Sequence, residues 1–123
     1  MRHTTKVLLA EDDLNFVRYL VALLEQMNCE IAVEHNGEDA IRRAATFQPD
    51  IALIGFVMPG LGGSATGIGL QNVSPRSKIV FIAEPVLPET LERLRALGYD
   101  FNALPTPFER VELEALVELS SRK

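Results

Sequence analysis

Cysteine, cationic residues and long apolar runs are all scarce in this 123-residue sequence. Cys29 is the only cysteine, which excludes an internal disulfide and fits a reducing compartment. Twelve lysines and arginines stand against seventeen aspartates and glutamates, and the net charge of -5 argues against a domain built to hold nucleic acid. No apolar run approaches the roughly 18 residues of a membrane span, and the N-terminus lacks a signal-peptide core. We therefore expect a cytoplasmic protein that binds neither nucleic acid nor membrane.

Motifs of catalysis and nucleotide binding are also missing. The glycines of residues 60–63 (GLGG) do not have the G-x-G-x-x-G spacing of a dinucleotide-binding loop. The sequence contains no G-x-S-x-G nucleophile elbow. We therefore expect no enzymatic activity and no nucleotide cofactor.

What the sequence does contain is a regular alternation of apolar runs and helical patterns. Its 47% hydrophobic and 24% charged residues are typical of a globular protein, and its length fits a single domain over residues 1–123. Short apolar runs typical of buried parallel strands occupy residues 6–10, 30–34, 51–54, 78–83 and 102–104. Five such strands separated by helices predict a parallel sheet covered by helices on both faces.

The helices between these runs carry recognisable start and stop signals. Asp13 and Asn36 are suited to cap the first two helices, and Pro88 suits the first turn of the fourth. Leu87 begins the leucine-lined face of that fourth helix, and Gly98 is expected to end it. The third helix, over residues 64–73, is expected to be weak or short because it contains two glycines.

Several motifs at the ends of these strands resemble one known family. They are residues 8–13 (LLAEDD), 36–38 (NGE), 49–54 (PDIALI) followed by 58–60 (MPG), and 106–108 (TPF). In order and spacing they resemble the receiver domains of two-component response regulators. The resemblance implies a flavodoxin-like (βα)5 three-layer sandwich with strand order 2-1-3-4-5 and a role in phosphorelay signalling.

The family's site residues fall on only partly matching positions. The acidic pair that binds Mg²⁺ falls on Glu11 and Asp12, which are both carboxylates. The phosphoacceptor aspartate falls on Gly55, which has no oxygen to phosphorylate. The switch hydroxyl falls on Ile82 and the phosphate-pairing lysine falls on Thr106. Three of these five positions have thus lost their chemistry, which predicts a pseudo-receiver.

Loss of the acceptor predicts a protein-interaction module that works without phosphotransfer. The resemblance implies a signalling protein as the partner, docked on the face of helix 4, strand 5 and helix 5, and leaves a homodimer open. Glu11 and Asp12 would bind Mg²⁺ weakly at best, because Mg²⁺ prefers octahedral oxygen ligation. Without a lysine at 106, one of the two acids should hold its proton more tightly, or both should turn to solvent.

Two alternatives stay open at this point. Another residue could accept phosphate, but Asp50 is predicted at the opposite end of its strand, and Ser64 or Thr66 would need an ordinary kinase. The second alternative is a small ligand bound where the acceptor is missing. That alternative requires an open apolar pocket at the strand ends.

Overall fold

The computed structural model describes residues 4–83 and 88–120, and strands and helices alternate along the chain. The strands are β1 (Thr5–Ala10), β2 (Cys29–Glu34), β3 (Ile51–Gly55), β4 (Lys78–Ala83) and β5 (Asn102–Pro105). The helices are α1 (Leu14–Leu24), α2 (Gly37–Phe47), α3 (Gly63–Val73), α4 (Pro88–Ala96) and α5 (Arg110–Ser120). None of the helices in these two ranges combines the length and the apolar character that a bilayer crossing requires.

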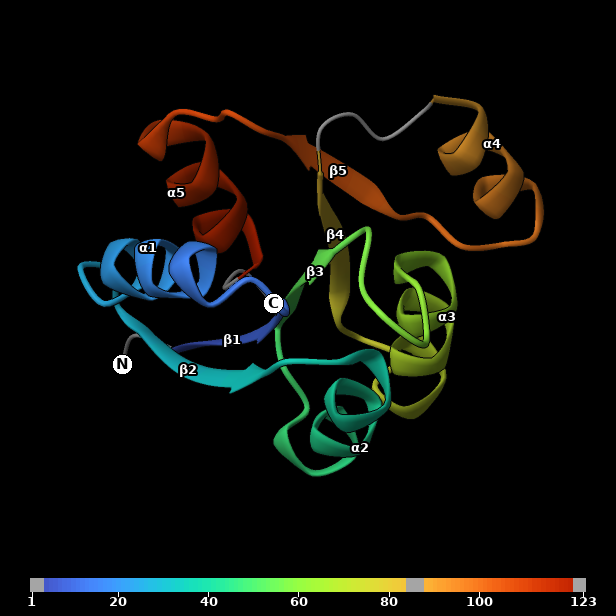
Figure 1. Ribbon diagram of the computed structural model, residues 1–123, viewed down its shortest axis with the longest axis horizontal. Helices are drawn as coiled ribbons and strands as arrows, with labels where there is room; N and C mark the ends of the chain where they lie inside the picture. Colours follow the sequence, from blue (N-terminus) through green and yellow to red (C-terminus); the bar gives the residue numbers. More distant parts are fainter. Residues whose placement is uncertain (1–3, 84–87, 121–123) are drawn as a thin grey trace.

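All strand pairs are parallel, and their order in the sheet is β2-β1-β3-β4-β5. This is the flavodoxin-like order that the sequence predicts. Figure 1 shows α1 and α5 together on one side of the sheet, with α2, α3 and α4 on the other. The chain therefore forms the predicted three-layer sandwich, in which the sheet is the middle layer.

The alternation of side chains along the strands divides the interior into two cores. Residues of β1, β3 and β4 that face α2, α3 and α4 include Leu8, Ile54 and Phe81. The alternate residues of the same strands face α1 and α5 and include Leu9 and Leu53. Because the central strands are buried on both faces, they appear in the sequence as continuous apolar runs.

The predicted helix caps are present. The Asp13 carboxylate accepts hydrogen bonds from the backbone N–H groups of Asn15 and Phe16 at the start of α1. Asn36 accepts a hydrogen bond from the N–H group of Asp39 in α2. Gly98 follows α4 with a positive φ of 98°, which favours glycine. Leu87, predicted to belong to the same leucine face, lies outside the described residues.

The predicted weakness of the third helix stays a prediction, but the expectation of a short helix is wrong, because α3 runs through eleven residues. The reason is that its glycines allow close packing. A Cβ on Gly67 would lie 3.1 Å from the ring of Phe101 and 3.2 Å from the ring of Phe81. Helix propensity counts only the local cost of glycine, whereas here tertiary packing compensates for that cost.

Gly63, the first residue of α3, provides a test of this packing. A Cβ there would lie 2.7 Å from the Cα and from the carbonyl oxygen of Phe56, and neither backbone atom can move alone. We predict that Gly63→Ala lowers the free energy of unfolding by about 1–3 kcal/mol, measured by urea denaturation. Gly69→Ala is the control and should cost less, because its Cβ would meet the movable end of the Ile41 side chain. Equal losses in the two variants would contradict this explanation.

Candidate functional site

The carboxyl ends of the strands meet at one edge of the sheet. In the parallel register Ala10 pairs with Ile54, Gly55 with Ile82, and Ile82 with Leu104. Two of the positions that the sequence singles out come directly after these strand ends: Glu11 follows β1, and Thr106 follows β5. The fold therefore brings the predicted site positions to the same edge.

The Glu11 side chain lies directly against Gly55. A Cβ placed on Gly55 would overlap Oε1 of Glu11 and would lie 3.0 Å from its Cδ atom. Glu11 is only 8% exposed although it is a carboxylate at the end of a strand. The space that a side chain at position 55 would need is therefore filled by the carboxyl group of Glu11.

Backbone hydrogen bonds hold this carboxyl group in place. Its Oε2 atom accepts hydrogen bonds from the N–H groups of Asp12 and Asp13, both at 3.0 Å. Burial raises the pKa of Glu11, the N–H group of Asp13 opposes that rise, and the side chain of Asp12 adds to it. This agrees with the expectation that one acid of the pair holds its proton more tightly, although burial is the main cause.

The other acidic side chains of this loop are more open to solvent than Glu11. Asp12 and Asp13 are exposed, and Asp13 is engaged as the cap of α1. Across residues 4–83 and 88–120, no three His, Cys, Asp or Glu side chains are grouped so that they could hold a metal ion. Among the described residues at this edge, the oxygen donors thus include the neighbouring carboxylates of Glu11 and Asp12, and that of Glu11 is already bound to backbone N–H groups.

Ile82 occupies the predicted switch position at the end of β4. It is 3% exposed and belongs to the core on the side of α1 and α5. Its carbonyl oxygen accepts a hydrogen bond from the N–H group of Phe56, at 3.2 Å, where the chain leaves β3. The side chain of Ile82 therefore serves packing, while its backbone fixes the start of the loop after Gly55.

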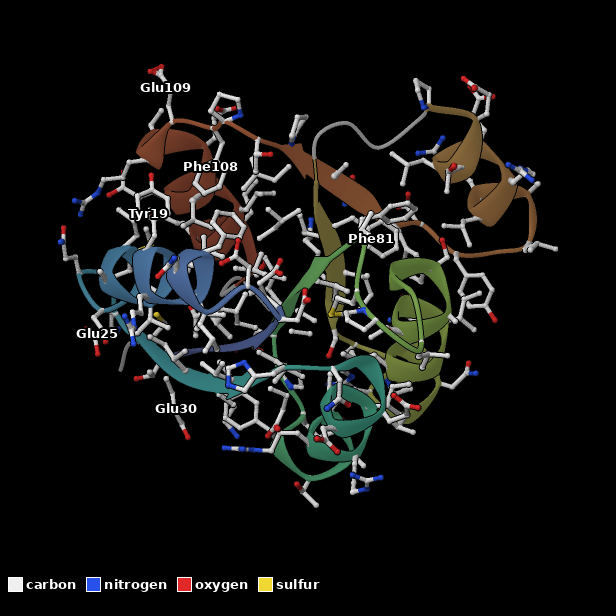
Figure 2. All side chains as sticks on the ribbon, in the orientation of Figure 1. Tyr19, Glu25, Glu30, Phe81, Phe108 and Glu109 are labelled. Carbon is white, nitrogen blue, oxygen red and sulfur yellow. The ribbon has the colours of Figure 1, made fainter. Side chains whose placement is uncertain are left out.

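Thr106 lines an apolar groove that the sequence pattern did not reveal. The groove has a volume of about 360 Å³ and is lined by Phe16, Tyr19, Thr106, Pro107 and Phe108. The ring of Tyr19 lies 6.3 Å from the rings of Phe16 and Phe108, and Figure 2 shows Tyr19 and Phe108 near one another between α1 and α5. The i, i+3 spacing of Phe16 and Tyr19 was the available signal, but only the fold brings Phe108 beside them.

The other oxygen-bearing side chains considered from the sequence lie in different surroundings. Asp50 precedes β3, and its carboxylate accepts a hydrogen bond from the N–H group of Lys6 at 2.8 Å, near the beginning of β1. Thr66 is fully buried in α3, where its hydroxyl donates to the carbonyl of Leu61. Ser64 is half-buried at the start of α3. Asp50 is therefore at the opposite end of the sheet, as the sequence predicts.

Comparison with known proteins agrees with this architecture. Residues 7–118 match the family model of the response regulator receiver domain. The chain belongs to the response regulator receiver domain family. It is a receiver domain of two-component signalling, a class of signalling modules.

Individual relatives are distant in sequence. The response regulator ArlR of Staphylococcus saprophyticus is 23% identical over 120 residues, which cover 97% of this chain and 53% of that protein. The receiver domain thus spans about half the length of this curated relative. Chemotaxis protein CheY4 of Vibrio cholerae has a similar structure, with a TM-score of 0.84, 18% identity and coverage of 96% and 99% of the two chains.

A third comparison concerns the receiver domain of sensor histidine kinase PA1611 from Pseudomonas aeruginosa. Its TM-score is 0.83 at 20% identity, with 98% of this chain and 100% of that chain covered. That crystal structure holds a magnesium ion coordinated in the active-site cleft. At this level of identity the similarity concerns the fold of the two receiver domains.

The buried position of Ile82 generates a prediction for the receiver domain. Ile82→Val removes one methylene and should lower the free energy of unfolding by about 1 kcal/mol. Ile82→Thr has nearly the same shape as that variant but buries a hydroxyl, which should cost roughly 1–3 kcal/mol more. Chemical denaturation of both variants measures the difference. If the two variants are equally stable, the hydroxyl finds a partner at this position and our account of the apolar surroundings is wrong.

Proposed function

We propose that this receiver domain acts as a protein-interaction module without being phosphorylated, as a pseudo-receiver. The observation that carries the proposal is the contact between Glu11 and Gly55. The residue at the acceptor position has no side chain, and a buried carboxyl group fills the space beside it. An incoming phosphoryl group would find no nucleophile at this position.

The surrounding residues support the same proposal. Formation of an acyl phosphate needs a carboxylate oxygen as nucleophile and positive charge to balance the phosphoryl oxygens. Gly55 provides no oxygen, and the buried Ile82 provides no hydroxyl. Thr106 provides no fixed positive charge in place of a lysine. Nucleophile, hydroxyl and cation are therefore absent from the three positions that the family uses for them.

We infer that Mg²⁺ fits the described donors at this edge poorly, whereas the PA1611 receiver domain has a coordinated magnesium ion in its crystal structure. Mg²⁺ requires near-octahedral oxygen ligation, usually from carboxylates together with a phosphate. Here Oε2 of Glu11 already accepts two backbone hydrogen bonds, which leaves Asp12 as the exposed carboxylate of the pair. We propose that the domain has no resident cofactor and binds Mg²⁺ weakly at best.

The proposed partner is a signalling protein, docked on the face formed by α4, β5 and α5. Exposed apolar side chains occur at two of these elements, since Leu97 after α4 is 72% exposed and Val111 in α5 is 64% exposed. Charged groups occur there as well: Arg95 of α4 lies 3.7 Å from Asp100, and Arg110 lies 3.0 Å from Glu114 in α5. Apolar area surrounded by charged groups is typical of transient protein interfaces, and a second copy of this chain is the alternative occupant.

We favour this proposal over the two alternatives, a different phosphoacceptor and a small-ligand site. Thr66 is buried and hydrogen-bonded, and Asp50 lies at the other end of the sheet, while the half-buried Ser64 stays open as an acceptor for an ordinary kinase. The space beside Gly55 is filled rather than open, so the apolar pocket required for a small ligand is not present at that point. Protein interaction remains the better supported proposal.

Phosphorylation provides the direct test. We predict that the wild-type domain gains no mass when it is incubated with acetyl phosphate and Mg²⁺, because Gly55 cannot accept a phosphoryl group. Intact-protein mass spectrometry, performed immediately because acyl phosphates hydrolyse, measures the gain. Addition of one phosphoryl group to the wild type would mean that another residue is the acceptor, and the pseudo-receiver proposal would have to be abandoned.

A rebuilt site is the matched control for that experiment. The triple variant Gly55→Asp, Ile82→Thr, Thr106→Lys restores the acceptor carboxylate, the hydroxyl and the cation at the three family positions. We expect this variant to gain one phosphoryl group, provided that circular dichroism shows it to be folded. A folded variant that gains none would mean that these three losses do not explain the inactivity of the site.

Mg²⁺ dependence of stability gives a second, independent prediction. A ligand that binds only the native state stabilises it by RT ln(1 + [L]/Kd), so the gain in stability grows as the ligand concentration exceeds Kd. We expect the unfolding temperature of the wild type to be the same in EDTA and in millimolar Mg²⁺, and that of Gly55→Asp to rise when Mg²⁺ is added. A clear Mg²⁺-dependent rise in the wild type, lost in Asp12→Asn, would show that the acidic pair still binds the ion.

A further inference from the structure

We propose that Glu11 is an internal plug, whose carboxyl group takes the place of the missing side chain at Gly55 and holds the start of α1 in one arrangement. The inference deepens the proposed function and rests on it, because it explains how a receiver domain without an acceptor holds the loop after β1 in one arrangement. Glu11 is thereby a positioning residue that acts through the backbone of the loop after β1.

The first step of the argument is steric. Among the atoms around Gly55, those nearest to an added Cβ all belong to the Glu11 carboxyl group: Oε1 in overlap, Cδ at 3.0 Å and Oε2 at 3.4 Å. None of these three nearest atoms belongs to the backbone. Any side chain at position 55 must therefore push the Glu11 carboxyl group away, and glycine is the residue that leaves it in place.

The second step is the anchoring of that carboxyl group. It accepts hydrogen bonds from the N–H groups of Asp12 and Asp13, so that it shapes the loop directly after β1. The backbone of Glu11 is itself tied to β2, since its N–H group donates to the carbonyl of Glu34 at 3.1 Å. Its carbonyl oxygen lies 3.1 Å from Nδ1 of His35. Glu11 is thus fixed through both its backbone and its side chain.

The third step links this loop to the groove. The N–H group of Asp13 is held by Glu11, and the carboxylate of Asp13 accepts from the N–H group of Phe16 at 3.3 Å as the cap of α1. Phe16 lines the groove together with Tyr19 and Phe108. Two consecutive hydrogen bonds, from Asp13 to Glu11 and from Phe16 to Asp13, therefore connect the carboxyl group beside Gly55 with the groove. Figure 2 labels Tyr19 and Phe108, two of the aromatic residues that line it.

A double-mutant cycle on Gly55 and Glu11 tests the plug. Alanine normally stabilises a strand position relative to glycine, because glycine loses more conformational freedom on folding. We expect the opposite for Gly55→Ala: the unfolding temperature falls by on the order of 4 °C, since Glu11 loses its hydrogen bonds. In the Glu11→Ala background the same substitution should leave the unfolding temperature unchanged or raise it.

The matched control replaces an exposed acid outside this loop. Glu30→Ala removes an acid of β2 that does not fill the space at Gly55, and its effect should add to that of Gly55→Ala. If Glu11→Ala and Gly55→Ala are also additive, Glu11 does not fill the position of the missing side chain and the inference is overturned.

Amide hydrogen exchange tests the link between Glu11 and α1. It distinguishes a local effect at named N–H groups from a general loss of stability, which would speed exchange throughout the domain. Glu11→Asp shortens the side chain by one methylene, so that its carboxyl group no longer reaches over Gly55. We expect faster exchange at the N–H groups of Asp12, Asp13 and Phe16 in this variant, with unchanged exchange in β4. Unchanged exchange at all three groups would overturn the link. Either failure leaves the phosphorylation result untouched, so the plug and the proposed function are tested separately.

Discussion

The parallel pairing of β1, β3 and β4 is the constraint on which the rest of the molecule depends. These strands are buried on both faces, so their backbone groups must pair with one another, and the register between them is fixed by two separate cores. The same register brings the residues after Ala10, Ile54 and Leu104 to one edge of the sheet. Whatever side chains stand at this edge become neighbours, whether or not they retain the chemistry of the family.

The receiver fold therefore does not depend on which side chains stand at this edge of the sheet. Ile82 contributes apolar area to the core, so an isoleucine at this position is compatible with a stable sheet. The absence of a side chain at Gly55 leaves no void, because Glu11 turns into the space and finds hydrogen-bond donors there. The fold requires filled space and satisfied polar groups at the edge of the sheet, and Glu11, Gly55 and Ile82 meet both requirements.

The apolar groove between α1 and Phe108 includes Thr106, one of the positions at this edge of the sheet. Its aromatic lining is available whatever the state of the acceptor position, and α1 is anchored at Asp13, close to Glu11. A receiver that switches must leave its helices and loops free to move between two arrangements. The proposed module has the opposite requirement, a single arrangement held by local packing and hydrogen bonds.

The sequence by itself determined the order of elements and the caps at Asp13 and Asn36, because these depend on local periodicity and on residue identity. Even the bounds of β4 agree with the apolar run of residues 78–83. Tertiary structure alone decided the length of α3, the direction of the Glu11 side chain and the existence of the aromatic groove. Each of these depends on contacts between residues far apart in the chain: Gly67 with Phe101, Glu11 with Gly55, and Tyr19 with Phe108. Local propensity does not contain such contacts, and they form only when the sheet brings its strands into register.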